Sequence, residues 1–154
     1  MTKTDEYIEN RLIWKAGKYK LPTNFSFYFR DLSSEIKKYL STQIDLNTSG
    51  NPVLFFTRPT KEWTLICTRQ VICNDTNRIF KINLSDIKEI LPTEFDPKIE
   101  GHLKVSKTVQ KKTKWDEIKI IDRQNRSYFF FADSGSDLFS LWNILLMAIR
   151  ISER

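Results

Sequence analysis

The fold of this chain is decided by residues 63–90, which read WTLICTRQVICNDTNRIFKINLSDIKEI. Short apolar runs in this stretch are separated by turn residues, a pattern that predicts three consecutive strands between residues 63 and 82. The first of them, 63–67, has apolar residues on both faces, which predicts a central position in a sheet. The stretch then ends in a tight turn that begins at Ser85 and Asp86.

The N-terminal residues 4–16 allow two interpretations. Acidic residues at the start and the spacing of Ile8 and Leu12 suit a helix that stops at Gly17. The alternation that continues to Leu21 suits a hairpin equally well. The sequence leaves this choice open.

A second amphipathic pattern begins after Pro22. Apolar residues recur at spacings of three and four, which predicts one helix that fades by Asp45. Residues 47–52 then form a loop by composition. An aromatic-rich stripe of this kind is typical of core rather than of a ligand site. Its members are Phe25, Tyr28, Phe29, Leu32, Ile36, Tyr39 and Leu40.

More strands are predicted on either side of the deciding stretch, and one helix closes the chain. The strands cover residues 53–57, 99–106, 115–121 and 126–132. Residues 134–137 resemble a helix cap, and the apolar stripe that follows consists of Leu138, Leu141, Trp142, Leu145 and Ile149. The fold class is therefore α+β, mainly β with helices: an N-terminal helical extension over 1–52, then strands and a C-terminal helix over 53–154.

The bulk numbers are those of an ordinary globular chain. It has 154 residues, of which 40% are hydrophobic and 29% charged, enough to bury one core. Its opening residues contain acids and no apolar run, so they do not predict a secretory signal, and the apolar run 144–149 is too short to span a membrane. Two cysteines without a disulfide pattern favour a reducing, cytoplasmic environment.

The net charge of +6 has two readings. It could attract nucleic acid, an anionic membrane or an acidic partner. Because acids are interleaved with the bases along the whole chain, it also fits a merely lysine-rich composition.

Little in the sequence points to catalysis. His102 is the only histidine, so any Ser-His-Asp or Cys-His device would need it. The alternative is a surface or edge-strand histidine. A zinc site needs about four ligands of His or Cys type, and the chain has one histidine and two cysteines. Only four glycines are present, and no phosphate-binding loop is seen. We therefore expect neither enzyme activity nor a cofactor or metal.

Two short motifs carry a resemblance to a known family. Residues 63–72 and 82–90 are similar to segments of bacterial pleckstrin-homology-like (PH-like) and GRAM-like domains: a strand, Thr68 and a second strand, then an apolar strand followed by Ser-Asp-Ile. Gln70 stands where those families usually have a basic residue, and Arg69 precedes it. The resemblance covers residues 53–151 and implies an antiparallel barrel of about seven strands capped by the C-terminal helix.

One local charge cluster stands out. Five lysines lie within residues 104–114 with no acid among them: Lys104, Lys107, Lys111, Lys112 and Lys114. In PH domains such loops bind phosphoinositide head groups, so the resemblance implies a site for anionic lipid. The alternative is a solvated loop. No aromatic residue is interleaved among these lysines, which argues against a single-stranded nucleic-acid platform.

The sequence supports three functional hypotheses. The first is a non-catalytic PH-like binding module that engages a protein partner. The second is a peripheral binder of anionic phospholipid head groups through the lysine loop. The third is an immunity-type or nucleic-acid-associated bacterial factor. The sequence does not identify the partner or the oligomeric state.

Overall fold

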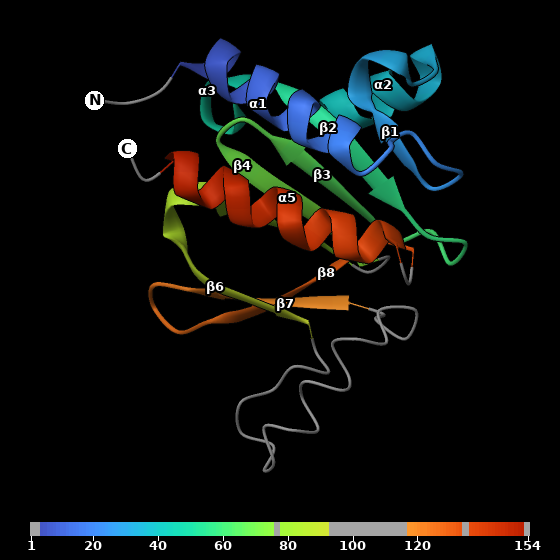
Figure 1. The fold of residues 1–154 in the computed structure, drawn as a ribbon. Helices are drawn as coiled ribbons and strands as arrows, with labels where there is room; N and C mark the ends of the chain where they lie inside the picture. Colours follow the sequence, from blue (N-terminus) through green and yellow to red (C-terminus); the bar gives the residue numbers. More distant parts are fainter. Residues whose placement is uncertain (1–3, 76–77, 93–116, 134–135, 153–154) are drawn as a thin grey trace.

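The structure, a computed structural model, describes residues 4–75, 78–92, 117–133 and 136–152. The strands of these residues form two antiparallel sheets (Figure 1). The five-stranded sheet contains, in spatial order, β1 (Ser26–Tyr28), β2 (Pro52–Thr57), β3 (Trp63–Cys67), β4 (Gln70–Asn74) and β5 (Ile79–Asn83). The three-stranded sheet contains β6 (Ile87–Pro92), β7 (Glu117–Asp122) and β8 (Ser127–Phe131).

Helices cover these sheets. The α-helices are α1 (Asp5–Lys18), α2 (Ser34–Thr42), α3 (Leu46–Ser49) and α5 (Ser136–Ser152), and the 3-10 turns are η1 (Phe29–Asp31) and η2 (Leu84–Asp86). Figure 1 shows α5 (red) running between the five-stranded sheet and the three-stranded sheet, with α1 (blue) beside it. None of the helices in the described ranges is long and apolar enough to cross a membrane.

The N-terminal segment is a helix, which settles the choice that the sequence left open. Thr4 caps α1 by accepting a hydrogen bond from the Tyr7 N–H at 3.1 Å. Ile8, Leu12 and Ala16 follow at intervals of four and are all buried in the main core. A capped start and an apolar stripe at helical spacing therefore outweigh the short alternation near Gly17.

The prediction of one helix from Phe25 to Leu40 is wrong. The segment instead forms β1, then η1, then a shorter helix α2 whose N-cap is Ser33. Its aromatic residues also alternate in sequence, and β1 uses that period of two to pair with β2, with Phe27 opposite Phe55. The sequence contains both a helical spacing and a period of two. Pairing with the backbone groups of β2 selects the period of two, so the segment forms a strand.

The five-stranded sheet is covered on both faces. Every residue of β3 is buried and this strand lies at the centre of the sheet, which confirms the prediction for 63–67. Alternate residues point to opposite faces. One face packs into the main core with α1 and α5, through Leu54, Phe56, Ile66, Val71 and Cys73. The other face packs against Leu40 of α2, through Phe55, Trp63, Leu65, Cys67 and Ile72.

The barrel expected from the resemblance does not close. In the described residues the strands form two separate sheets, and no ladder of backbone hydrogen bonds joins them. Side chains connect the sheets instead: the Thr64 hydroxyl on β3 donates to the Phe131 carbonyl of β8 at 2.7 Å and accepts from the Phe131 N–H at 3.1 Å. The Cys73 thiol donates to the Phe129 carbonyl at 3.4 Å. Because β3 and β4 already have strand neighbours on both sides, β8 can bond only to their side chains.

The terminal helix α5 fills the space between the sheets. Its predicted stripe is correct in Leu138, Leu141 and Leu145, which are fully buried, and Trp142 Nε1 donates to the Ile90 carbonyl of β6 at 3.2 Å. Ile144 and Ala148 are also fully buried, although they lie outside that stripe. A helix enclosed by two sheets and by α1 buries more than one face, so a single stripe underestimates its core contribution.

The start of α5 is tied to the N-terminal part of the chain. Asp137 is buried, and its carboxylate accepts hydrogen bonds from the Thr23 hydroxyl at 2.8 Å and from the Ser26 hydroxyl at 3.2 Å. Desolvation raises the pKa of Asp137, and the two hydroxyl groups oppose that rise. These contacts link β1 to α5 across a long sequence separation and are a structural arrangement rather than a reactive one.

A second buried carboxylate organises the turn between β7 and β8. Asp122 accepts hydrogen bonds from the backbone N–H groups of Gln124 and Arg126, both at 2.9 Å, from Arg126 Nε at 2.9 Å and from the Tyr128 hydroxyl at 3.0 Å. Burial alone would raise the pKa of Asp122, but these hydrogen bonds outweigh it and lower the pKa below its usual range.

We therefore expect Asp122→Asn to destabilise the protein in a pH-dependent way. A folded-state pKa below the unfolded value of about 3.9 gives a stabilisation that is complete above that pH and is lost as the pH falls through the folded-state pKa. The difference in urea midpoint between wild type and variant should be largest at neutral pH and shrink below about pH 4. Asp31→Asn, at an exposed position, controls for the loss of one charge. A difference that stays constant down to acid pH would contradict the expectation.

Candidate functional site

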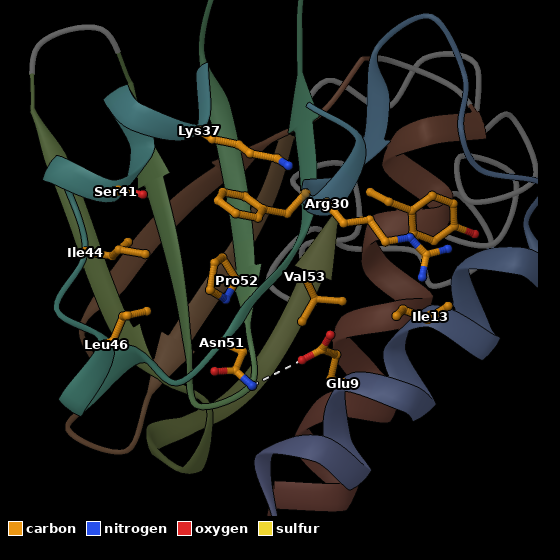
Figure 2. Close-up of a pocket in the computed structure, with 12 residues that line it drawn as sticks. Glu9, Ile13, Arg30, Lys37, Ser41, Ile44, Leu46, Asn51, Pro52 and Val53 are labelled. Carbon is orange, nitrogen blue, oxygen red and sulfur yellow. Dashed lines mark hydrogen bonds between the residues drawn. The ribbon is translucent and has the colours of Figure 1, made fainter. Parts of the chain in front are cut away.

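A groove of about 470 Å³ lies between α1 and the α2–α3 segment, above the start of β2 (Figure 2). We refer to it as the α1–α2 groove. Its apolar lining consists of Ile13, Phe29, Ile44, Leu46, Pro52 and Val53. Its charged lining consists of Glu9, Arg30 and Lys37. The lining comes from α1, β1, η1, α2, α3 and β2, so six separate elements build it.

The groove exists because α1 and the α2–α3 segment, which cover opposite faces of the five-stranded sheet, meet at this edge without filling the space between them. Ile13 packs against the core between α1 and the sheet, whereas Phe29 and Ile44 pack against the core under α2. Leu46, at the first position of α3, is 61% exposed, a high value for a large apolar side chain. The side chains of this groove therefore expose apolar surface to solvent, although the two core clusters beneath it are buried.

Charge is distributed unevenly along the groove. Figure 2 shows Lys37 near one end, Pro52 and Val53 in the middle, and Glu9 with Asn51 near the other end, whereas the Arg30 guanidinium lies at the side of the groove, near Ile13. Glu9 Oε1 accepts a hydrogen bond from Asn51 Nδ2 at 3.1 Å. The Arg30 guanidinium lies 5.1 Å from the centre of the Tyr28 ring, a cation–π distance that holds it at the wall. Within the part of the chain that the structure describes, neither Arg30 nor Lys37 forms an ion pair.

A second pocket, of about 540 Å³, lies at the N-terminal end of α1 and is more polar. Arg69 binds Asp5 through two bonds, Nη2 to Oδ2 at 2.6 Å and Nε to Oδ1 at 3.0 Å, and the Thr68 hydroxyl donates to Asp5 at 2.9 Å. The hydrogen bond from Arg69 is the largest influence on Asp5 and lowers its pKa. These groups satisfy one another, so we interpret them as the anchor of α1 on the β3–β4 turn.

Thr68 also binds the backbone just before β2. Its hydroxyl accepts from the Asn51 N–H at 3.0 Å, as expected for a residue in a bend between strands. The neighbouring Gly50 has a φ of +73°, and a Cβ there would collide with the Thr68 hydroxyl. Only glycine satisfies both conditions without strain.

The predicted basic site is not part of the described structure. Lys104, Lys107, Lys111, Lys112 and Lys114 lie outside the described residues, as does His102. The lipid site that the resemblance implied therefore stays a prediction.

The two cysteines are structural. Both are buried and free, and they face opposite sides of the five-stranded sheet: Cys67 lies in the core under α2 and Cys73 in the main core. Burial raises the pKa of each thiol to about 12, so both are protonated at neutral pH and neither is a competent nucleophile. In the described ranges no group of His, Cys, Asp and Glu side chains is placed to hold a metal ion.

Sequence reasoning missed the groove. The sequence predicted residues 47–52 only as a loop, whereas the structure forms helix α3 from Leu46 to Ser49 there. No local pattern links these residues to Ile13, because their proximity depends on how α1 and α2 cover the sheet. No protein-family model, curated protein or solved structure matches this chain.

Proposed function

We propose that this chain is a non-catalytic binding module of the PH-like type that engages a protein partner through the α1–α2 groove. The strand order supports the family assignment. Strands β2 to β5 follow one another as neighbours, β6 to β8 do the same, and α5 comes last and packs between the two sheets. Seven strands, β2 to β8, followed by a helix support this proposal, although they form two sheets rather than a closed barrel, and β6 was not among the predicted strands.

The observation that carries the proposal is the open, mainly apolar groove. Ligand pockets commonly have volumes of about 300–1,000 Å³ and are lined by apolar side chains with a few polar groups, and this groove fits that description. Leu46 supplies apolar surface that a partner would remove from water, at about 25 cal/mol per Å². Further large apolar residues are exposed on the two neighbouring helices: Tyr7 and Trp14 on α1, and Ile36 and Tyr39 on α2.

The polar groups of the groove suit binding better than catalysis. They comprise two cations, one carboxylate that is already bonded to Asn51, and the hydroxyl of Ser41. A nucleophile would need an adjacent base in hydrogen-bond reach. No hydrogen bond links Ser41 to Glu9 or to another side chain of the groove.

The proposal is tested by affinity capture from a lysate of the native source, with wild type and two variants as bait. Leu46→Glu places a charge in the groove, and because Leu46 is exposed and begins α3, glutamate should be tolerated there. Phe129→Glu makes the same kind of change at another exposed apolar position, on β8. We expect a protein that wild type and Phe129→Glu retain and that Leu46→Glu loses.

Two results would contradict the proposal. The first is a set of captured proteins that is the same for wild type and Leu46→Glu, which would remove the groove from the interaction. The second is a turnover by the purified chain that disappears in His102→Ala, which would show that the chain is catalytic.

A further inference from the structure

We infer that the α1–α2 groove selects a peptide segment in which an acidic side chain lies close to a large apolar one. This inference rests on the proposed function and adds the chemistry of the partner. The acidic side chain would bind the cations that line the groove, Lys37 and Arg30, and the apolar side chain would cover Pro52, Val53 and Leu46.

The two cations of the groove have no carboxylate partner among the described residues. Arg30 and Lys37 come from η1 and α2, both line the groove, and neither meets a carboxylate in an ion pair among the described residues. Lys37 is half-buried, so its ammonium group is less hydrated than a fully exposed one. Lys37 attracts an anion more strongly than a fully exposed lysine does, because part of the surrounding water is replaced by apolar side chains. The exposed Arg30 adds a second positive charge to the groove.

The other end of the groove is already satisfied. Glu9, the carboxylate in its lining, is bonded to Asn51, and it would repel a second acidic group placed beside it. An acidic ligand group is therefore directed away from Glu9 and toward Lys37, which Figure 2 shows across Pro52 and Val53 from Glu9, with Arg30 at the side of the groove. The distribution of charge fixes both the place of the acid and the direction in which the apolar side chain must extend.

The shape of the site favours a peptide over other anions. Nucleic-acid binding relies on several phosphate contacts along a wide basic surface, whereas this groove offers two cations and one carboxylate. A flat bilayer cannot enter a recess whose apolar lining includes the buried Val53 and the half-buried Pro52 and Ile13. Individual side chains of an extended or helical peptide can do so.

The test is selection from a random peptide display library on the purified full chain. We expect wild type to enrich peptides that carry Asp or Glu near Leu, Ile, Phe, Trp or Met. The double variant Arg30→Gln with Lys37→Gln should lose the acidic preference and keep the apolar one. Arg30→Glu with Lys37→Glu should select basic residues instead. A matched control, Lys38→Glu with Lys61→Glu, changes the charge equally at exposed positions outside the groove lining and should select as wild type does.

Affinity then measures the effect of the two cations. A synthetic peptide with the enriched sequence should bind the Gln double variant about ten- to a hundredfold more weakly than wild type, since one charge-assisted contact is worth about that factor. Urea unfolding of each variant shows whether it remains folded. A change of less than about twofold in a folded variant, roughly 0.4 kcal/mol or below, would overturn the inference.

The outcomes separate this inference from the proposed function. Enriched peptides that depend on Leu46 but lack acids would overturn the inference and leave the protein-binding proposal intact. If no enriched peptide depends on Leu46, both fail. Sedimentation of wild type, but not of the Glu double variant, with phosphatidylserine vesicles and not with phosphatidylcholine vesicles would overturn the inference by assigning the groove to a membrane.

Discussion

Replacing Thr64 with valine is expected to lower the free energy of unfolding by about 2–5 kcal/mol, because the change leaves two buried backbone groups without partners. Thr64 is fully buried and its hydroxyl bonds both the N–H and the carbonyl of Phe131. Residues along an antiparallel strand alternate in the direction of these groups. Those of Phe131 point toward β3, where the Thr64 hydroxyl bonds both of them. Valine keeps the shape of threonine and removes the bonds.

Thr64→Ser is the matched control. It keeps the hydroxyl and loses one methyl group, so it should cost only about 1 kcal/mol. Urea unfolding followed by tryptophan fluorescence measures both variants, since the chain has four tryptophans. If valine were as stable as wild type, or more stable than serine, the two sheets would not depend on this hydroxyl for their connection.

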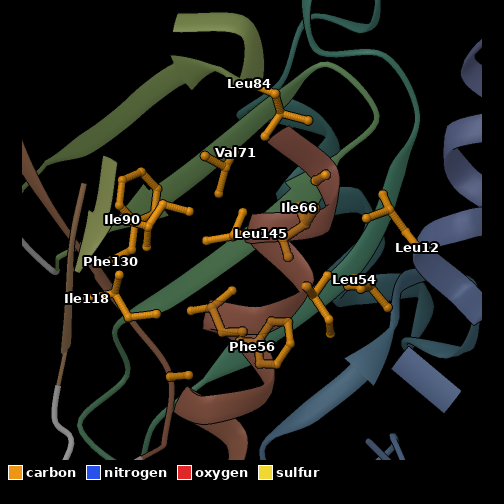
Figure 3. Close-up of a cluster of buried hydrophobic side chains, with 14 of the residues drawn as sticks. Leu12, Leu54, Phe56, Ile66, Val71, Leu84, Ile90, Ile118, Phe130 and Leu145 are labelled. Atoms are coloured by element: carbon orange, nitrogen blue, oxygen red, sulfur yellow. The ribbon is translucent and has the colours of Figure 1, made fainter. Parts of the chain in front are cut away.

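Leu145→Ala is expected to lower the free energy of unfolding by about 2–5 kcal/mol, the usual range for a fully buried leucine whose cavity cannot collapse. Figure 3 shows Leu145 of α5 among Ile66 and Val71 of the five-stranded sheet and Ile90 and Ile118 of the three-stranded sheet. A cavity at this position faces two sheets whose own pairing holds them in place. The surrounding atoms therefore cannot easily move to refill it.

Leu46→Ala removes the same atoms from an exposed position on α3 and serves as the control. Its effect should stay within about 0.5 kcal/mol. Because the two variants carry the same leucine-to-alanine change, the difference between their free energies of unfolding measures the effect of burial. Equal effects of the two variants would mean that α5 does not fill the space between the sheets.

The local pattern was a good guide within residues 63–86 but was wrong at 47–52, where the predicted loop contains most of helix α3 (Leu46–Ser49). Residues 63–67 are apolar on both faces and lie at the centre of their sheet, and the turn at Ser85 and Asp86 lies where it was expected. The segment after Phe25 was misjudged because its aromatic residues fit two periods at once. A spacing of three and four suggested a helix, and the spacing of two that β1 uses became decisive only when β2 was beside it.

The candidate site was harder to predict than the fold. The sequence directed attention to the lysines of 104–114, because a run of like charges is visible in one dimension. The α1–α2 groove joins Ile13, Arg30, Leu46 and Val53, which no spacing rule connects. These residues lie close together because α1 covers one face of the five-stranded sheet and α2 covers the other. Their proximity could therefore be inferred only once the positions of both helices were known.

By itself the amino-acid sequence determined local elements: the strands between residues 63 and 83, and the apolar helix that closes the chain. These properties depend on the periodicity and polarity of neighbouring residues, which act over a few positions of the chain. Only the tertiary structure decided that the strands form two sheets joined by Thr64 and that β1 is a strand. It also decided that a mainly apolar groove with three charged side chains opens between α1 and α2. Those features depend on contacts between residues far apart in sequence, where the packing of one element sets the environment of another.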